Sequence, residues 1–246
     1  MKTALKGALK GAGWYQPVSN AWMGIEPRLI AVTRALLGTN QRLIKSYLAH
    51  TTEPKLHIGC GANHLDGWLN TELCPHGREI FLDATRTFPL QSGVFAFVYS
   101  EHMIEHIPYA QARAMVSECF RVLRPGGVIR LVTPNLAFLA TLLERDLTPF
   151  QHAYIDYSVQ QYAIRDGAGS GVHVFNHFMR AWGHQFIYDQ SSLNRLVGEA
   201  GFVDLVAGDL SESQHARLRG IAKVERMPEG FLAAESIVVE ARKPGR

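Results

Sequence analysis

Residues 55–73 read KLHIGCGANHLDGWLNTEL, and this stretch decides how the rest of the chain is interpreted. Residues 55–58 form a short apolar run typical of a buried strand, and Gly59 and Gly61 break it with two permissive positions. A glycine loop directly after a strand is typical of nucleotide-binding α/β domains. Glu72 follows Gly61 by only eleven positions, and the intervening residues are poor helix formers. The stretch therefore predicts a ligand-binding loop without the long helix that normally follows it.

The composition limits the class of protein. The 246 residues, 47% of them hydrophobic, are enough for one large α/β domain with an appendage. A net charge of +3 without a long basic run argues against a nucleic-acid partner. The three cysteines, Cys60, Cys74 and Cys119, have no CxxC spacing and cannot all pair, which favours a reducing cytoplasm over a disulfide framework. No apolar run reaches the roughly 18 residues of a membrane span.

The first 50 residues predict a helical extension. Lys2, Lys6 and Lys10 recur every four residues and would share one helix face. This face is either solvated or makes a weak contact with a membrane surface. No continuous apolar core of a signal peptide accompanies it. Residues 21–49 are typical of one or two amphipathic helices, with Pro27 near the start and Gly38 at a break.

Residues 51–246 alternate between strand-like and helical segments. The strand-like segments are 55–59, 68–73, 94–100, 128–133, 202–207 and 236–241, and the helical ones are 109–123, 136–145 and 190–200. This alternation predicts a Rossmann-like, mostly parallel sheet with helices on both faces. Residues 148–188, rich in Tyr, His, Phe and Gly, interrupt the pattern, and we expect them to form a lid over an acceptor pocket.

Further motifs follow the glycine loop in the order that a nucleotide site requires. Glu72 ends the second strand, where a carboxylate can accept hydrogen bonds from ribose hydroxyls. Asp83, in IFLDATRTFPL, stands where it could receive an adenine amino group. The segment FAFVYSEHMIEHIP (95–108) is a strand that ends in polar residues, and CFRVLRPGGVIRLVTPN (119–135) reads as helix, turn and strand.

Together these motifs resemble the class I S-adenosylmethionine (SAM)-dependent methyltransferases, in particular a branch that acts on small molecules. The resemblance runs over residues 54–208 and more weakly to 242. It implies a seven-stranded sheet with the last strand antiparallel, and SAM as the cofactor. It also implies the cofactor contacts: the loop Gly59, Cys60 and Gly61 at the methionine part, Glu72 at the ribose, Asp83 and Ala84 at the adenine, and Ser100 beside the methyl donor.

Two positions depart from this family's pattern. His57 stands where members usually carry an acid, and we expect it to orient the cofactor amine through water. Asn63 replaces the third glycine of the loop. These departures leave a second interpretation open, in which the chain is a binding module that kept the fold and lost catalysis.

The run HMIEH, residues 102–106, has further interpretations. It matches the H-x-x-E-H motif of zinc hydrolases, although Pro108 ends the segment too soon for the helix that such a site needs. It is also similar to the E-x-x-E-H motif of some metal-dependent methyltransferases, which would place a cation at His102, Glu105 and His106. Because His102 replaces the first glutamate, we expect no metal here and treat His106 as a residue that faces the substrate.

The resulting functional hypothesis is methyl transfer from SAM to a small or medium-sized acceptor, at oxygen. The transfer is a direct displacement, so alignment of the two reactants supplies much of the catalysis. An oxygen acceptor must also lose a proton, and a histidine is suited to accept it near neutral pH. His106 is the first candidate for this base and His177 the second. The sequence does not identify the acceptor.

Overall fold

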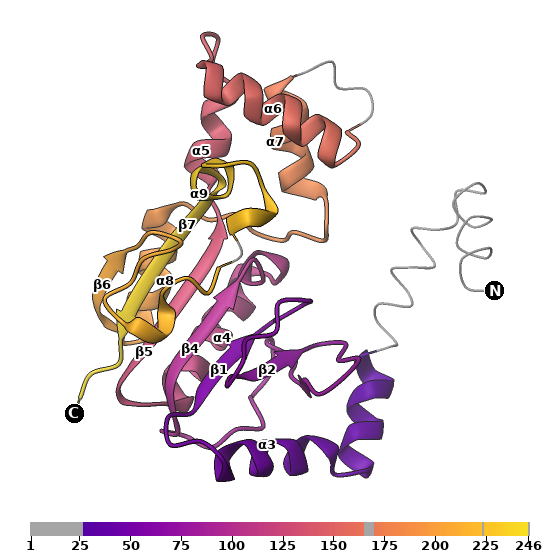
Figure 1. Cartoon of the computed structure of the whole chain (residues 1–246), viewed down its shortest axis with the longest axis vertical. Coiled ribbons are helices and arrows are strands. Elements are labelled where there is room, and N and C mark those ends of the chain that lie inside the picture. The colour runs from indigo at the N-terminus through magenta and orange to yellow at the C-terminus, as the bar shows by residue number, and fades with distance from the viewer. Residues whose placement is uncertain (1–26, 165–169, 223, 246) are drawn as a thin grey trace, which may run out of the picture.

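The computed structural model describes residues 27–164, 170–222 and 224–245. A seven-stranded sheet crosses its centre in the order β3-β2-β1-β4-β5-β7-β6 (Figure 1). Among these strands only β7 is antiparallel to its neighbours, β5 and β6. This confirms the predicted sheet. The strands are β1 (Lys55–Ile58), β2 (Leu69–Glu72), β3 (Ile80–Phe81), β4 (Phe95–Glu101), β5 (Leu123–Pro134), β6 (Val203–Ala207) and β7 (Ser236–Arg242).

The ends of the predicted strands lie within one or two residues of the observed ends, except at the start of β5. One observed strand, β3, was not among the predicted segments. β3 has two residues, too few for a hydrophobic pattern to show. β5 begins at Leu123 instead of 128, because the Pro125–Gly127 turn continues into the strand with a register shift against β4.

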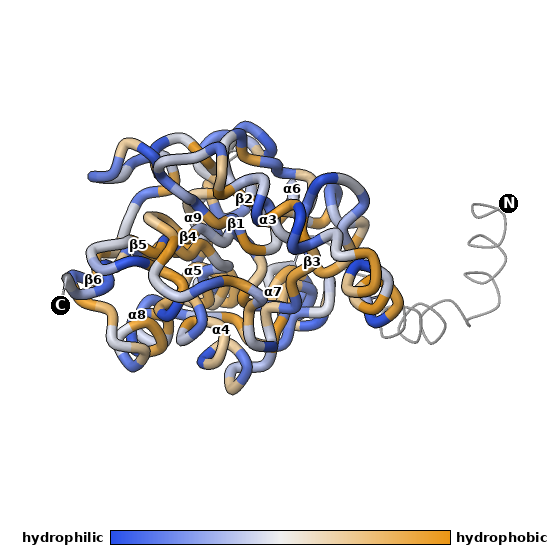
Figure 2. The backbone as a smooth tube through the Cα atoms, turned by 90° about the horizontal axis from the view of Figure 1, so that it is seen from below, coloured by the Kyte–Doolittle hydropathy of each residue, from blue (hydrophilic) through white to orange (hydrophobic). Residues whose placement is uncertain are grey.

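The two faces of the sheet are covered differently. α4 (Tyr109–Val122) and α8 (Gln190–Glu199) pack one face through a continuous apolar core. The other face, at Trp68 and Tyr99, packs against residues from the segment 208–232. That segment is mostly irregular, with short 3-10 helices at Ala216–Leu218 and Val224–Arg226. Hydrophobic segments concentrate around the central strands, and outer loops are mainly hydrophilic (Figure 2).

The connection from β1 to β2, residues 59–68, contains no helix, as the sequence predicted. The side chain of Asn70 organises it instead. Its Oδ1 accepts hydrogen bonds from the Leu65 amide (3.0 Å) and from His57 Nδ1 (3.0 Å). Its Nδ2 donates to the carbonyls of Leu65 and Trp68. One amide side chain thus satisfies backbone groups that a helix would otherwise pair internally.

The described part of the N-terminal extension covers the edge of the sheet. Residues 27–36 are helical, and α3 (Thr39–Ala49) follows after a turn. Asn40 Oδ1 accepts from the Phe81 amide and Asn40 Nδ2 donates to the Phe81 carbonyl, so the edge strand β3 has its exposed backbone groups paired. The lysine face at Lys2, Lys6 and Lys10 lies outside the described residues. Among the residues that are described, no helix is long and apolar enough to cross a membrane.

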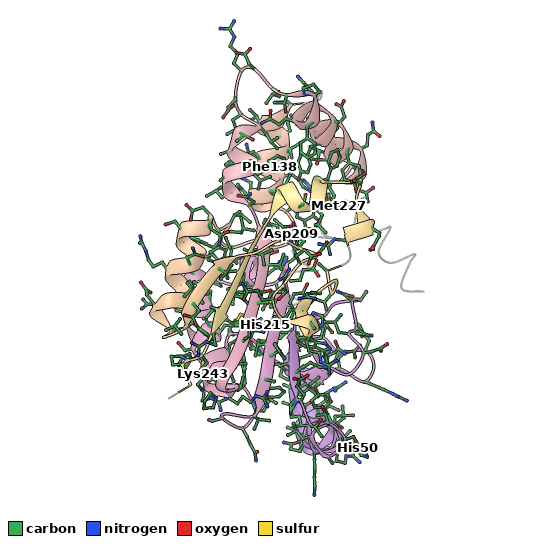
Figure 3. The ribbon with its side chains drawn as sticks, turned by 60° about the vertical axis from the view of Figure 1, so that its left-hand side comes forward. His50, Phe138, Asp209, His215, Met227 and Lys243 are labelled. Atoms are coloured by element: carbon green, nitrogen blue, oxygen red, sulfur yellow. The ribbon has the colours of Figure 1, made fainter. Side chains whose placement is uncertain are left out.

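A second, smaller core lies beyond the carboxyl ends of the strands. It joins α5 (Leu136–Thr141), α6 (Pro149–Gln161), α7 (Gly171–Arg180) and α9 (Phe231–Glu235). Leu139, Tyr154, Phe178 and Phe231 are buried among them. Figure 3 places Phe138 within this group of helices and Met227 at its lower margin. The described parts of this region, 148–164 and 170–188, therefore pack on α5 and α9 in addition to reaching toward the sheet.

Replacing Asn70 by alanine tests whether one side chain holds the helix-free connection. Asn70→Ala removes four hydrogen bonds at once, so we expect the free energy of unfolding to fall by about 2–3 kcal/mol in urea titrations. Asn176→Ala is the matched control, since its exposed amide donates to a single carbonyl. Equal losses in the two variants would contradict the role of Asn70.

Candidate active site

A cavity of about 360 Å³ lies at the carboxyl ends of β1 and β2. Its size is in the range of small-molecule sites. Five of the residues predicted to contact the cofactor line it: Gly59, Gly61, Glu72, Asp83 and Ala84. The other lining residues are Ile58, Leu73, Leu82, Thr85, His102, Met103, His106 and Ile107. The structure therefore brings together residues from the first three strands and from the turn after β4.

The two glycines of the loop differ in what surrounds the position of a Cβ. Both have positive φ, +67° at Gly59 and +49° at Gly61, so both suit a residue without a Cβ. At Gly59 a Cβ would lie 2.3 Å from Cγ of Met103, so this glycine lets the Met103 side chain pack against the loop. At Gly61 a Cβ would meet no described atom within 4 Å. Gly61 therefore leaves room on the cavity wall.

The two acids of the cavity also shape its backbone. Glu72 accepts hydrogen bonds from the Gly61 amide (2.9 Å) and the Leu73 amide (2.7 Å), which ties the glycine loop to the end of β2. Asp83 accepts from the amide and hydroxyl of Thr85 (2.9 and 2.6 Å). Each carboxylate has further lone pairs for a ligand, since an ionised carboxylate offers about four acceptor sites.

Three of the predicted cofactor residues do not line the cavity. His57 is 1% exposed and its Nδ1 bonds Asn70, with burial lowering its pKa to about 4. Cys60 is buried as well, and burial raises the pKa of its thiol to about 12. Ser100 is buried with its hydroxyl donating to the Ile58 carbonyl (3.1 Å), which joins β4 to β1. The side chains of His57 and Ser100 join neighbouring strands below the cavity, and that of Cys60 is buried in the loop.

The turn after β4 carries the HMIEH run. His102 has φ +47°, an uncommon value for a residue with a Cβ. Residues Ile104–His106 form a 3-10 helix rather than an α-helix, so the long helix of a zinc hydrolase is not present here. Burial would lower the pKa of His102, but the Glu105 carboxylate 3.4 Å away outweighs it and holds that pKa above its ordinary value.

A second cavity, of about 420 Å³, opens on the other side of this turn. Aromatic residues of the lid and ionisable groups line it together. The aromatic part is Tyr157, Tyr162, Phe178 and Trp182, and the ionisable part is His102, Glu105, His106, His184, Arg226 and Glu235, with Gln161, Pro134 and Met227 completing the wall. Apolar surface with a few converging polar groups is typical of a site for a small molecule.

His106 lines both cavities, as does His102. The His106 side chain is 34% exposed, and its Nδ1 lies 3.0 Å from the Trp182 carbonyl. Since a carbonyl only accepts, Nδ1 carries the hydrogen and Nε2 keeps its lone pair. His106 is thus a potential proton acceptor between the two cavities.

His177 is placed differently from His106. Its ring stacks on Tyr162 at 5.7 Å between centroids and meets Trp182 edge to face. It lines neither of the two cavities, and burial lowers its pKa. In this position it supports the aromatic wall of the second cavity from behind.

Several residues of the second cavity were not singled out as site residues. Glu235 is 4% exposed, accepts a hydrogen bond from the Tyr154 hydroxyl and has a pKa raised by burial. Arg226 pairs with Glu101 at 3.1 Å. Neither has a local motif that could have identified it, because both reach the cavity from the C-terminal part of the chain.

Comparison with known proteins agrees with this geometry. Residues 56–131, from β1 into β5, match the family described as "Methyltransferase domain". The strand order of the sheet and the glycine-loop cavity correspond to the expectations from the motifs. Residues 56–131 therefore form a methyltransferase domain of the SAM-dependent type. The methyl donor of such a domain is SAM.

Individual relatives are more distant. A protein of Mycolicibacterium smegmatis, described as a probable SAM-dependent methyltransferase, is 44% identical over 62 residues, which are 25% of this chain and 23% of that protein. The match thus spans less than a quarter of the relative's length. A SAM-dependent methyltransferase structure from Archaeoglobus fulgidus is 15% identical with a TM-score of 0.46, over 85% of this chain and 94% of the other. A possible histamine N-methyltransferase from Thermotoga maritima is 14% identical with a TM-score of 0.44, over 89% and 99%.

The residues of the first cavity fit SAM. Gly61 leaves open space on the wall, where a larger residue would project a side chain. Glu72 and Asp83 supply acceptors at two separate points, suited to hydroxyl and amino donors. Leu73 and Leu82 add apolar surface between them. A nucleoside with a positively charged sulfur group suits the two carboxylates and the apolar surface.

The buried, neutral His57 predicts a pH dependence of stability. Its pKa is about 4 in the folded chain and about 6.5 when unfolded, so between these values only the unfolded chain binds the proton. The contribution of His57 to the free energy of unfolding is therefore fully present above pH 6.5. About 3 kcal/mol of it is lost as the pH drops toward 4. In urea titrations from pH 7 to 4, His57→Gln should lose less stability than the wild type. Parallel profiles for the two proteins would show that His57 does not contribute.

Proposed function

We propose that this methyltransferase domain transfers the methyl group of SAM to a hydroxyl oxygen of a small or medium-sized acceptor. The observation that carries the proposal is the wall that the two cavities share. His102 and His106 line both the cavity with the glycine loop and the cavity beneath the lid. A donor on one side and an acceptor on the other would meet at this wall, and such alignment can supply a large part of the rate of a direct displacement.

The donor side consists of residues that bind rather than react. Gly59 and Gly61 would hold the methionine part, Glu72 the ribose hydroxyls, and Asp83 with Ala84 the adenine. When bound there, SAM supplies a methyl carbon that is already electrophilic. His57 and Ser100 would act indirectly, because they join the strands that carry the loop, and Cys60 would act as a buried part of the loop itself.

The acceptor side consists of the lid and the histidines. We propose residues 148–188 as the lid, with Tyr157, Tyr162 and Trp182 providing apolar walls. The acceptor hydroxyl would lie against Nε2 of His106. In the reaction the acceptor O–H bond breaks, its proton goes to Nε2, and the oxygen forms the bond to the methyl carbon. The bond from that carbon to sulfur breaks and leaves neutral S-adenosylhomocysteine.

The alternative of a non-catalytic binding module has less support. It rested on His57 and Asn63, yet His57 is buried outside the cavity and therefore cannot weaken binding by facing the cofactor. We also propose the cytoplasm as the compartment, in agreement with buried thiols at Cys60 and Cys119.

Binding of S-adenosylhomocysteine tests the donor side. We expect calorimetry to show one site per chain, and the ligand to raise the melting temperature because it binds the native state selectively. Gly61→Val should lower the affinity at least tenfold, a loss of about 1.4 kcal/mol, since the side chain would project into the cavity. Gly93→Val is the matched control: it also has positive φ and open space around its Cβ, but lies outside the cavity. Absence of binding to the wild type would overturn the proposed function.

Turnover of a His106 variant tests the acceptor side. His106→Ala should lower turnover by about 10²–10⁴, the typical contribution of general acid–base catalysis, while affinity for S-adenosylhomocysteine stays close to wild type. Release of S-adenosylhomocysteine can be measured with the best acceptor from a panel of sugars, phenols and aliphatic alcohols. His177→Ala should have a smaller effect, because this histidine lies behind Tyr162. A larger loss from His177→Ala would reverse the two assignments.

A further inference from the structure

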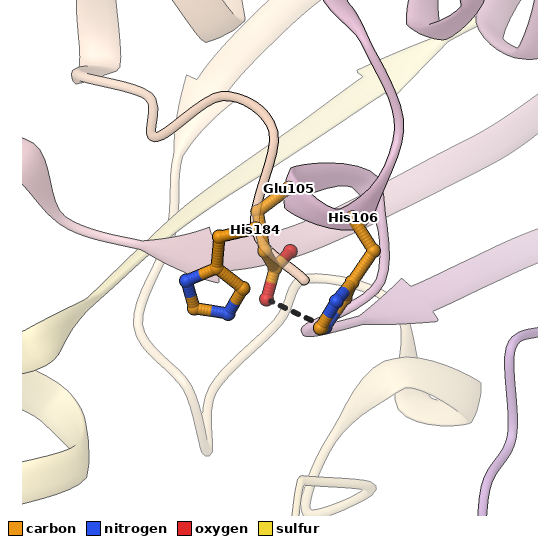
Figure 4. A group of neighbouring side chains, drawn as sticks. All are labelled: Glu105, His106 and His184. Atoms are coloured by element: carbon orange, nitrogen blue, oxygen red, sulfur yellow. Dashed lines mark ion pairs between the residues drawn. The ribbon is translucent and has the colours of Figure 1, made fainter. Parts of the chain in front are cut away.

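The second cavity also contains a cluster of metal-ligand types, for which the sequence offered Glu105 and His106 but not His184. A donor atom of Glu105, one of His106 and one of His184 all lie within 4.8 Å of one another. Glu105 and His106 come from the turn after β4, whereas His184 comes from the loop between α7 and α8. In Figure 4 the carboxylate of Glu105 lies between the two imidazole rings. His102, which the sequence offered as a ligand, is not part of this set.

Both imidazoles are held so that one nitrogen is available. His106 Nδ1 lies 3.0 Å from the Trp182 carbonyl, and His184 Nδ1 lies 2.6 Å from the Phe178 carbonyl. Since carbonyls only accept, both Nδ1 atoms carry hydrogen and both Nε2 atoms keep their lone pairs. A hydrogen bond from the second ring nitrogen to a carbonyl is the usual way in which proteins orient a metal-binding histidine.

One oxygen of the Glu105 carboxylate has no hydrogen bond from the described residues. Glu105 is 0% exposed, and its Oε2 accepts a hydrogen bond from the Thr133 hydroxyl (3.0 Å). Its Oε1 is buried and accepts no hydrogen bond from any residue that the structure describes. His102 Nδ1 lies 3.4 Å from it, at ion-pair distance, and His106 Nε2 lies 4.0 Å from it. His102 therefore compensates part of the charge, and a bound cation would occupy the lone pairs of Oε1 that accept no hydrogen bond.

The backbone holds His184 beside this carboxylate. The amides of Gln185 and Phe186 both donate to the Glu105 carbonyl, at 2.7 and 3.2 Å. The loop that carries His184 is therefore attached directly to the residue that it faces. The cluster is fixed by main-chain bonds and does not depend on the orientation of one surface side chain.

We infer that Glu105 Oε1, His106 Nε2 and His184 Nε2 bind a divalent first-row transition-metal ion of the zinc type. Two imidazoles and one carboxylate are a common ligand set of catalytic zinc, whereas magnesium and calcium prefer oxygen ligands. Ligands bound about 2.0–2.1 Å from zinc stand about 3.3 Å apart, so the three groups must close by roughly 1.5 Å. Three protein ligands leave one coordination position open toward the acceptor cavity.

This inference rests on the proposed function and refines the role of His106. An acceptor hydroxyl in the open position would lose its proton to water, because a bound metal ion lowers the pKa of an oxygen that it coordinates. The oxygen would then form the bond to the methyl carbon as before. His106 would in that case act through the ion instead of taking the proton itself. This proposal departs from the expectation of no metal, which was drawn from His102 and from the helix end at Pro108.

The test is metal binding by the full chain after treatment with a chelator and dialysis. Zinc titration should show one equivalent per chain and raise the melting temperature, and cobalt should give the visible absorption of a low-coordinate site.

His184→Ala should weaken zinc binding by more than the roughly 10–100-fold that follows loss of an outer-shell partner. His184→Cys should restore much of it, because a thiolate is also a zinc ligand. His152→Ala is the matched control, an exposed lid histidine outside the cluster.

The outcomes separate the two proposals. S-adenosylhomocysteine binding by His184→Ala shows that this variant is folded, since His184 does not line the donor cavity. If the wild type binds no stoichiometric zinc or cobalt, or if His184→Ala binds it as well as the wild type, the metal site is refuted while donor binding stands. If zinc binds through His184 but S-adenosylhomocysteine does not bind, the metal site stands and the methyltransferase function fails.

Discussion

The contact between the lid and the sheet depends on the burial of Glu105 in the turn after β4. Its carbonyl holds the lid loop through the amides of Gln185 and Phe186, and its carboxylate accepts a hydrogen bond from Thr133 on β5. One residue therefore joins two parallel strands to a segment about 80 positions later. The bridge between Asn135 and Tyr188 is a second attachment of this segment to the sheet. The site exists because a charged residue lies where the strands end.

A buried charge needs compensation, and the chain provides it in two ways. Arg130 is 0% exposed, and its guanidinium meets the Glu240 carboxylate and the carbonyls of Asp209, Leu210 and Glu212. That set of partners is internal, and it holds the segment after β6 onto the sheet. Glu105 is compensated differently, because one of its oxygens faces two histidines at 3.4 and 4.0 Å without a hydrogen bond from the described residues. Arg130 is thus matched mainly by carbonyls and one carboxylate, whereas Glu105 relies on imidazoles that also line a cavity.

The sequence predicted the strands of the sheet more accurately than it predicted which side chains line the site. Strand positions follow from hydrophobic runs, and Gly59, Gly61, Glu72 and Asp83 do line one cavity, since loops at strand ends must meet at the same edge. His57 and Ser100 belong to strands, where successive side chains alternate between faces, so proximity in sequence did not place them in the cavity. The contact of His184 with Glu105 could not have been predicted, because it depends on the path of the lid loop.

The helix-free connection after β1 is consistent with the kind of ligand that the cavity favours. A long helix behind a glycine loop directs a positive dipole and free amides at an anion such as pyrophosphate. Here Asn70 pairs the backbone of the connection, and Glu72 takes the amide of Gly61. The loop consequently presents a carboxylate to the cavity in place of unpaired amides. Such a wall is less suited to phosphate than a helix N-terminus, and it offers an acceptor to a ligand that carries hydroxyl groups or positive charge.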